Sequence, residues 1–353
     1  MEFAKRQVKF FGSFFKKRTV FPLCLRPTAG AIILAAIQKA REGIGLEKPR
    51  IGYAGVGLMG HGAAGSILSH GYGLTILGNR NRAPVDDLVA RGAVEAADVS
   101  ALAAGSDIVF LCLPSSVEVE RMVLGEGGML GCVRAGMVVV DSTSADPAST
   151  RRIGALLAAR GCGFVDGPLG RTPLEAEAGK LSTFLGGDAE WVARVRPVVE
   201  CYADTIIEAG ALGAAHTLKL CNNFISLGTA GVIAEAVATA RKLGVDLERL
   251  FEAVSSGGAN SAMFQMMMPW VLQGDDSRLR GPLRIGAKDL RFYCRMAEGA
   301  PAPAPIAQAI SQVFQAAIVA GEGERMIPVL PGLLAAANRC PIRDLDPPAL
   351  DRA

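Results

Sequence analysis

Between residues 50 and 188 the chain alternates short apolar runs with longer amphipathic segments. Six runs bounded by glycine, proline, serine or aspartate have the length of buried strands. Helical patterns such as 84–93 and 147–161 lie between them. Because strands that alternate with helices form a parallel sheet covered on both faces, we predict an α/β fold with a Rossmann-type doubly wound sheet. The runs are 50–57, 73–80, 106–114, 136–143, 162–168 and 181–188.

Beyond Gly210 the pattern changes to helices alone. Residues 214–244 keep helical periodicity over a stretch far longer than an average helix, and more helices are predicted within 246–257, 283–299 and 304–321. We therefore predict a poorly ordered extension, a NAD(P)-binding Rossmann domain, an all-helical substrate and dimerisation domain, and a tail. Their ranges are 1–48, 49–209, 210–338 and 339–353.

Composition narrows the functional classes. Half of the residues are hydrophobic and 20% are charged, as in a globular protein, and the net charge of +3 is too small to suggest nucleic-acid binding. Eight scattered cysteines without a CxxC pair indicate a reducing compartment, which favours the cytoplasm. With three histidines, none near a cysteine at ligand spacing, we expect no metal site.

The first 48 residues differ from the rest, because Lys and Arg alternate with Phe in "FAKRQVKFFGSFFKKR". Three interpretations remain open: an unstructured extension or upstream sequence translated from an early start, a presequence, or a helix on a membrane surface. Membrane contact is expected only through residues 1–20.

A glycine-rich loop follows the first predicted strand and opens a helix. Gly55, Gly57 and Gly60, with Leu58 and Met59 between them, fit G-x-G-x-x-G. In this context the backbone N–H groups and the helix N-terminus can hold a pyrophosphate, so we predict dinucleotide binding. The alternative is a tight turn with no ligand.

The end of the second strand bears on the cofactor's identity. Asn79, Arg80 and Arg82 occur there, and no acidic residue occurs before Asp86. An acidic side chain would bind the ribose of NAD, whereas arginine suits a 2′-phosphate. We therefore predict NADP, with NAD still possible; in the alternative interpretation both arginines only solvate a loop.

The long helix carries a polar stripe. Lys219, Asn222, Asn223 and Ser226 lie at i, i+3, i+4 and i+7 and so share one face of an otherwise apolar helix. Buried polar groups need partners, so the stripe marks a site or a polar seam between domains or subunits. In hydride transfer to a carbonyl, a protonated lysine can supply the proton while an asparagine holds the geometry. No tyrosine is followed four residues later by lysine, so Lys219 is the preferred acid.

Together these segments resemble the β-hydroxyacid dehydrogenase family, which includes 3-hydroxyisobutyrate dehydrogenases and tartronate semialdehyde reductases. The resemblance runs from about Arg50 to Ala320 and rests on several motifs in the family's order. These are "GVGLMGHGAAGSIL", "DSTSADP", "DGPLGRTPLEAEAGKL", "GALGAAHTLKLCNNF" and "KDL". Gly62 and Ser66 stand where the family often has proline and asparagine.

The resemblance implies a helical C-terminal domain that packs against its own copy in a homodimer or homotetramer. It implies Lys219 as general acid/base and Asn222 or Asn223 as the residue that orients the substrate. It also places the nicotinamide near the loops after the third and fourth strands and closes a lysine of the "KDL" motif over the cofactor. The residues concerned are Leu113, Pro114, Thr143, Ser144 and Lys288.

The loop Gly170-Arg171-Thr172 departs from the Ser-Gly-Gly of commoner family members and is similar to that of the sulfolactaldehyde reductases, as is Ser226. An arginine adds a positive fork of donors. We therefore expect these four residues to bind a small anionic substrate, a hydroxyacid or semialdehyde with an anionic tail. In the alternative interpretation Arg171 pairs only with Glu175 or Glu177. An imine reductase-like enzyme and a non-catalytic nucleotide-binding scaffold are the rival functions.

Overall fold

The structure, a computed structural model, describes residues 48–343. The chain divides into two units, Met1–Lys48 and Pro49–Ala353, and the second contains every predicted site residue. The predictions for residues 1–47, including membrane contact through residues 1–20, and for 344–353 concern residues outside the described ones.

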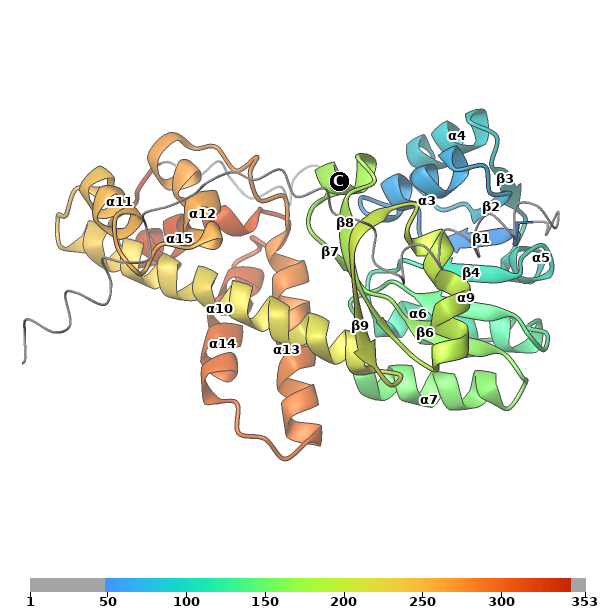
Figure 1. Cartoon of the computed structure of the whole chain (residues 1–353). Helices are drawn as coiled ribbons and strands as arrows, with labels where there is room; N and C mark the ends of the chain where they lie inside the picture. The colour runs from blue at the N-terminus through green and yellow to red at the C-terminus, as the bar shows by residue number, and fades with distance from the viewer. Residues whose placement is uncertain (1–47, 344–353) are drawn as a thin grey trace, which may run out of the picture. The chain divides into compact units, whose positions relative to one another are not determined.

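A mainly parallel sheet forms the first half of the described chain (Figure 1). Strands β3, β2, β1, β4, β5 and β6 lie side by side in that order, and every neighbouring pair among them is parallel. This is the strand order of a doubly wound dinucleotide-binding sheet, so the predicted Rossmann-type fold is confirmed. The strands are β1 (Ile51–Ala54), β2 (Leu74–Leu77), β3 (Val94–Ala96), β4 (Ile108–Leu111), β5 (Val138–Asp141) and β6 (Gly163–Asp166).

Beyond β6 the sheet becomes mixed. Strand β8 (Leu181–Gly186) pairs antiparallel with β6 and with β7 (Leu169–Gly170), and parallel with β9 (Ala203–Gly210). The sequence pattern predicted neither this reversal nor the strands β3, β7 and β9. Strands β3 and β9 expose most of their residues and β7 has only two, so none contains the apolar run that marks a buried strand.

Helices cover both faces of the sheet. Val138 and Val140 belong to one buried cluster with side chains of α3 and α9, whereas Val139 belongs to another with side chains of α5 and α7. Successive residues of a strand point to opposite faces, so the two clusters are the two cores. The helices are α3 (Gly60–Ser69), α4 (Ala83–Ala90), α5 (Val99–Ala104), α6 (Ser116–Leu124), α7 (Pro147–Ala158), α8 (Pro173–Glu177) and α9 (Ala189–Val199), with a 3₁₀ turn at Met129–Gly131.

Helices dominate the chain after β9, as predicted. The 29-residue helix α10 packs against all five α-helices that follow it within the described residues and contributes to a third buried cluster, which includes Phe264, Trp270 and Phe314. The helices are α10 (Ala214–Lys242), α11 (Leu247–Ser255), α12 (Ala262–Gln273), α13 (Leu283–Gly299), α14 (Pro305–Val319) and α15 (Leu330–Ala337), with a 3₁₀ turn at Ile327–Val329.

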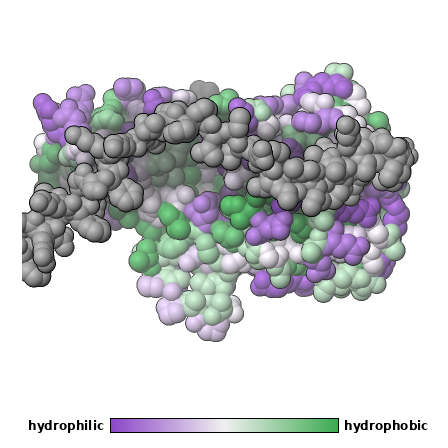
Figure 2. Space-filling view, viewed as in Figure 1, coloured by the Kyte–Doolittle hydropathy of each residue, from purple (hydrophilic) through white to green (hydrophobic). Residues whose placement is uncertain are grey.

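Helix α10 also has exposed apolar residues. Ile225 and Val232 are 68% and 62% exposed, and Figure 2 shows hydrophobic residues on the surface around α10 and α14. By length and composition α10 could cross a membrane, but the central helix of a folded domain meets the same criteria. Its packing against α12, α13, α14 and α15 makes it such a central helix.

Candidate active site

The predicted cofactor loop joins β1 to α3. A Cβ on Gly55, whose φ is +98°, would overlap a backbone carbonyl after β4, and a Cβ on Gly60 would overlap the carbonyl of Gly55. In contrast, a Cβ on Gly57 would have no atom within 4 Å. Leu58, 71% exposed, and Met59 complete the loop. The loop is therefore packed at both ends and open in the middle, where a pyrophosphate could approach the backbone.

Gly62 accounts for one departure from the family pattern. A Cβ there would overlap the carbonyl group of Ala176 in α8. Close packing of α3 on α8 thus requires glycine at this position. This departure from the family pattern therefore concerns helix packing and lies away from the open part of the glycine loop.

The two arginines after β2 have different surroundings. Arg82 pairs with Glu95 of β3 at 2.7 Å and with Asp86 at 3.0 Å, so its guanidinium is already engaged by two carboxylates. Arg80 donates its backbone N–H to Asn79 Oδ1 at 2.7 Å, and within residues 48–343 its guanidinium has no partner. Arg80 is therefore the better placed of the two for a phosphate.

Glu95 is an acidic group that the sequence analysis did not associate with the ribose position. It belongs to β3, but a Cβ on Gly78, just after β2, would overlap its carboxylate. An acidic residue was expected within the segment that follows β2, whereas Glu95 belongs to the neighbouring strand β3. Arg82 lowers the pKa of this carboxyl group through hydrogen bonds.

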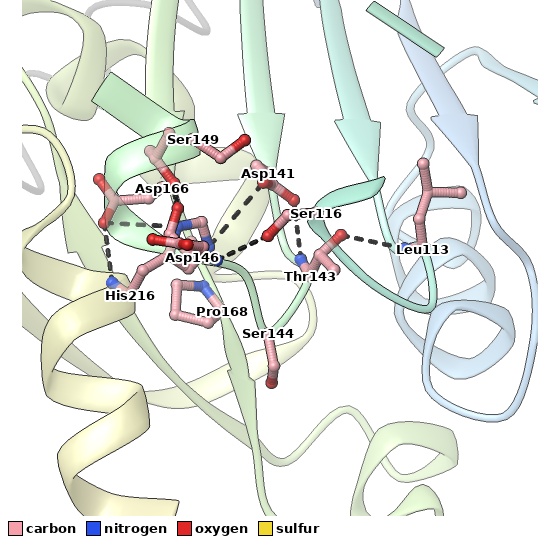
Figure 3. A network of polar contacts seen from close by, with 12 residues as sticks. Leu113, Ser116, Asp141, Thr143, Ser144, Asp146, Ser149, Asp166, Pro168 and His216 are labelled. Carbon is pink, nitrogen blue, oxygen red and sulfur yellow. Dashed lines mark hydrogen bonds and ion pairs between the residues drawn. The ribbon is translucent and has the colours of Figure 1, made fainter. Parts of the chain in front are cut away.

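The loops after β4 and β5 are joined by hydrogen bonds (Figure 3). The N–H of Leu113 donates to Thr143 Oγ1 at 3.1 Å, and the N–H of Thr143 donates to Asp141 Oδ1 at 3.0 Å. Thr143 is buried, so it fixes the conformation of both loops. These loops follow the carboxyl ends of adjacent parallel strands, where ligands bind in sheets of this kind.

Lys288 of α13 reaches the same two loops. Its ammonium group donates to the carbonyl oxygens of Pro114, at 2.8 Å, and Ser144, at 3.2 Å. The structure thus brings together the predicted cofactor residues that come from three separate parts of the chain. Asp289, the next residue, is buried and lies 3.2 Å from the Lys288 ammonium through Oδ1.

Asp289 also links Lys288 to the polar stripe of α10. Its Oδ2 accepts a hydrogen bond from Asn223 Nδ2 at 2.7 Å, and Asn222 lies beside Asn223 with 3.4 Å between their side-chain amides. In the sequence, Asp289 is the middle residue of the "KDL" motif, and no role was predicted for it. Its position directly after Lys288 was the one available signal.

Lys219 is partly buried near both charges of this group. Burial lowers the pKa of its ammonium; attraction to Asp289 raises this pKa and repulsion from Lys288 lowers it further, and the net direction is down. A lysine with a lowered pKa exchanges protons more readily near neutral pH. Ser226, also partly buried, lies two turns further along the same helix.

The loop Gly170-Arg171-Thr172 has a conformation that suits glycine at its centre. Arg171 has φ +71°, and its guanidinium pairs with Asp204 at 2.8 Å and donates to Thr205 Oγ1 at 3.0 Å and to the carbonyl oxygen of Lys180. The alternative prediction of a salt bridge from Arg171 to Glu175 or Glu177 is wrong, because the partner is Asp204. Asp204 is the second residue of β9, a strand that the sequence pattern did not predict.

The acidic residues of α8 have other partners. Glu175 accepts from the N–H of Thr172 at 3.1 Å and from its hydroxyl, which closes a capping box at the start of α8. Glu177 bonds to His61 Nδ1 at 2.8 Å, while His61 Nε2 bonds to Asp87 at 2.9 Å. His61 therefore connects α3 to α4 and to α8.

Comparison with known proteins identifies the family of this chain. Residues 50–210 match the family model of the NAD-binding domain of 6-phosphogluconate dehydrogenase, and residues 213–327 match that of the NAD-binding region of NADP-dependent 3-hydroxyisobutyrate dehydrogenase. A 3-hydroxyisobutyrate dehydrogenase-like protein of Arabidopsis thaliana is 31% identical over 78% of this chain and 84% of its own. The chain belongs to the β-hydroxyacid dehydrogenase family.

Other relatives of this dehydrogenase are named for different substrates. The 2-(hydroxymethyl)glutarate dehydrogenase of Eubacterium barkeri is 30% identical over 78% of this chain and 91% of its own, and the 3-sulfolactaldehyde reductase of Escherichia coli is 28% identical over 78% and 92%. The non-catalytic scaffold therefore has no support, and this dehydrogenase is an NAD(P)-dependent enzyme acting on hydroxyacids.

Solved structures of relatives confirm the fold of this dehydrogenase. The 3-hydroxyisobutyrate dehydrogenase of Salmonella typhimurium is 25% identical, covers 81% of this chain and 100% of its own, and superposes with a TM-score of 0.72. A complex with NADP⁺ is also 25% identical, covers 80% and 99%, and superposes with a TM-score of 0.71. The cofactor is therefore NAD(P).

Proposed function

We propose that this dehydrogenase transfers hydride reversibly between NADP and a short 3-hydroxyacid or its semialdehyde that carries an anionic group, with Lys219 as general acid/base. The observation that carries the proposal is the position of Lys219 on the polar stripe of α10. There it interacts with Asp289 and Lys288, and Lys288 bonds to the loops at the carboxyl ends of β4 and β5.

The proton chemistry belongs to Lys219. The bound oxidised nicotinamide would supply the acceptor for the hydride, which leaves the hydroxyl-bearing carbon with both electrons of its C–H bond. As the neutral amine, Lys219 takes the proton of the hydroxyl group, so that the carbon–oxygen bond becomes a carbonyl. In the opposite direction its ammonium donates a hydrogen bond to the carbonyl oxygen and then returns the proton.

Asn222 and Asn223 would orient the substrate beside that amine. Asn223 is itself oriented by Asp289, because its Nδ2 donates to that carboxylate. Its amide oxygen is 3.4 Å from Asn222 Nδ2, so the two amides can adjust together around a substrate oxygen.

The preference for NADP rests on Arg80. Its guanidinium has no partner within residues 48–343, whereas that of Arg82 is held by Glu95 and Asp86. A 2′-phosphate would offer Arg80 two parallel hydrogen bonds, and the NAD ribose would not. Arg80 is thus proposed to contribute more to binding of NADP than of NAD.

The substrate's anionic end is proposed to bind at Gly170–Thr172. A sulfonate or dianion is the second candidate for this group, favoured by the arginine in the loop and by the relative named 3-sulfolactaldehyde reductase. In the described structure the Arg171 guanidinium is paired with Asp204, so an anion would recruit it from that pair or bind the loop amides that the pair holds in place.

A substrate panel tests these proposals. We expect the purified chain to oxidise at least one of 3-hydroxyisobutyrate, glycerate and sulfolactate with NADP⁺, or to reduce succinic semialdehyde with NADPH. Lys219→Ala should lower kcat by a factor of about 10³ or more, as expected for loss of a general acid/base. Activity that survives this substitution would contradict the mechanism.

The same panel tests Arg171. Arg171→Gly, compatible with the positive φ, should lower kcat/KM for sulfolactate relative to glycerate by about tenfold, which corresponds to about 1.4 kcal/mol. Arg196→Ala is the matched control, because Arg196 pairs with Glu208 of the same strand β9. An unchanged ratio for Arg171→Gly would leave the arginine without a role in selecting the anion.

A further inference from the structure

Two buried carboxylates lie side by side at the carboxyl ends of β5 and β6. Asp141 and Asp166 are register partners across these strands, and they are 1% and 0% exposed. Burial raises the pKa of Asp141, and the Asp166 charge raises it further, whereas the nearby His216 and the bonds from Thr143 lower it. Two like charges at this depth require compensation from their surroundings.

Asp166 obtains part of that compensation from the start of α10. Its Oδ1 accepts from the N–H of Gly213 at 2.8 Å. Its Oδ2 accepts from the N–H of His216, also at 2.8 Å (Figure 3). The first turn of a helix has free N–H groups and a partial positive charge. Asp166 therefore caps the helix that carries Lys219, although it lies 47 residues before Gly213.

The imidazole of His216 occupies the remaining space between the carboxylates. It is fully buried, its Nε2 lies 4.0 Å from Asp141 Oδ2, and its Nδ1 lies 4.0 Å from Asp166 Oδ2. Nδ1 also bonds to the hydroxyl of Thr150 in α7 at 2.7 Å. An apolar side chain of the same size would leave both carboxylates without this polar neighbour.

The partners of Thr150 restrict the proton on His216. The Thr150 hydroxyl lies 3.1 Å from the carbonyl oxygen of Asp146, the usual partner of a helical threonine. If the hydroxyl donates there, Nδ1 of His216 must donate to Thr150; if it donates to Nδ1, then Nε2 carries the proton and directs it toward Asp141. In the first arrangement the ring N–H is bonded to α7, and in the second it faces Asp141, whose Oδ2 lies 4.0 Å from Nε2.

We propose that His216 is a positioning residue that holds α10, and with it the ammonium of Lys219, in register with the nicotinamide-side loops. The contacts form a series. The N–H of Leu113 donates to Thr143, the N–H of Thr143 donates to Asp141, and Asp141 lies 4.0 Å from His216 in the first turn of α10. Lys219 follows His216 by three residues, about 4.5 Å along the helix axis. A shift of this turn would therefore move the amine relative to the substrate.

This inference rests on the proposed role of Lys219, and the test separates the two. The enzyme, as full-length chain, is assayed with the best compound of the panel, both unlabelled and deuterated at the hydroxyl-bearing carbon. His216→Leu removes both ring nitrogens, His216→Gln can still bond to Thr150, and Thr150→Val removes the bond from the other side. His70→Leu, on the surface at the end of α3, is the matched control.

We expect His216→Leu to lower kcat by ten- to a hundredfold, the scale of a displacement of about 1 Å at a reacting group. The primary isotope effect on kcat should increase, the KM for NADP should stay within about twofold, and His216→Gln should recover most of the rate. Thr150→Val should change kcat and the isotope effect in the same direction as His216→Leu, by a smaller factor.

Loss of rate in proportion to loss of folded protein, with an unchanged isotope effect, would overturn the inference and leave His216 a purely structural residue. Wild-type kcat in His216→Leu would do the same. If His216→Leu does not fold, His216→Gln and Thr150→Val decide the question by the isotope effect. An active Lys219→Ala enzyme would overturn the proposed mechanism instead, whatever the result at His216.

Discussion

Gly57 and Gly60 have opposite surroundings although they belong to one loop. A Cβ on Gly60 would overlap the carbonyl of Gly55, whereas a Cβ on Gly57 would lie in open space. We expect Gly60→Ala to lower the free energy of unfolding by about 1–3 kcal/mol, as overpacking does. Gly57→Ala should leave Tm unchanged and raise the KM for NADP by about tenfold, because the methyl group would occupy the path of the pyrophosphate.

Thermal unfolding and cofactor kinetics on both variants measure this difference. Unaltered NADP kinetics in Gly57→Ala would show that the opening at Gly57 does not receive the cofactor. Gly258→Ala, at a loop glycine between α11 and α12 that has open space around it and no positive φ, controls for general effects of glycine replacement.

The pKa of Lys219 gives a second prediction at the scale of single residues. Burial and Lys288 lower it, and Asp289 raises it. Alcohol oxidation requires the neutral amine, so kcat/KM should rise with pH and level off above the pKa of Lys219 in the free enzyme. Asp289→Asn should move this limb to lower pH, and Lys288→Met should move it to higher pH.

The two shifts have opposite signs, so they separate charge effects from general damage. The measurement is the pH profile of kcat/KM for oxidation of the best panel compound. Shifts of the same sign in both variants would mean that Lys219 does not control this limb.

At the scale of elements, His61 joins three helices by hydrogen bonds. From α3 it bonds to Asp87 in α4 and to Glu177 in α8. Burial lowers the pKa of His61, but the bonds to Glu177 and Asp87 outweigh burial, so the pKa is raised. A raised pKa in the folded protein means that folding stabilises the charged form, and this contribution is full below the unfolded pKa and is lost as pH rises through the folded pKa.

His61→Leu should therefore lower Tm most at about pH 6 and progressively less toward about pH 9, where the wild-type imidazole is neutral. Melting curves at several pH values measure this trend, with His70→Leu as the control for loss of an exposed histidine. A Tm difference that is independent of pH would mean that packing, and not the ion pairs, accounts for the effect of His61.

Sequence patterns predicted the elements that are defined by their own residues. The apolar runs of β1, β4 and β5 and the polar stripe of Lys219 arise from local periodicity, which is visible in a single chain. The strands β3 and β9 lack that periodicity because they are mostly exposed. As a result, the sequence pattern could not predict that Glu95 of β3 and Asp204 of β9 pair with Arg82 and Arg171.

The sequence also did not predict which residues of the candidate site contact one another. Asp289 contacts Asn223 across 66 residues, and His216 contacts Thr150 across the same separation. Such pairs depend on which strand ends and helices meet, and neither residue spacing nor composition specifies this. Lys288 and Lys219 could be predicted as site residues because motifs mark them, whereas their charged neighbours could be identified only from the fold.

At the scale of the whole molecule, we expect a homodimer or homotetramer, as the family resemblance implies. The exposed apolar side chains of α10 supply a surface for it, since Ile225 and Val232 are 68% and 62% exposed. The double variant Ile225→Glu with Val232→Glu should shift the assembly to the monomer, measured by size-exclusion chromatography with light scattering. Val94→Glu, on the edge strand β3, is the matched control. A wild-type chain that is monomeric at micromolar concentration would contradict the expectation.

Asp166 belongs to β6, and yet its carboxylate accepts the N–H groups that open α10. During synthesis these amides emerge long after the strand that will hold them. Residues 210–338 expressed by themselves would lack this acceptor, and the turn that leads to Lys219 would fray at its start. The helical half therefore lacks an acceptor for its own first turn, and we expect the turn that leads to Lys219 to be complete only when β6 is present in the same chain.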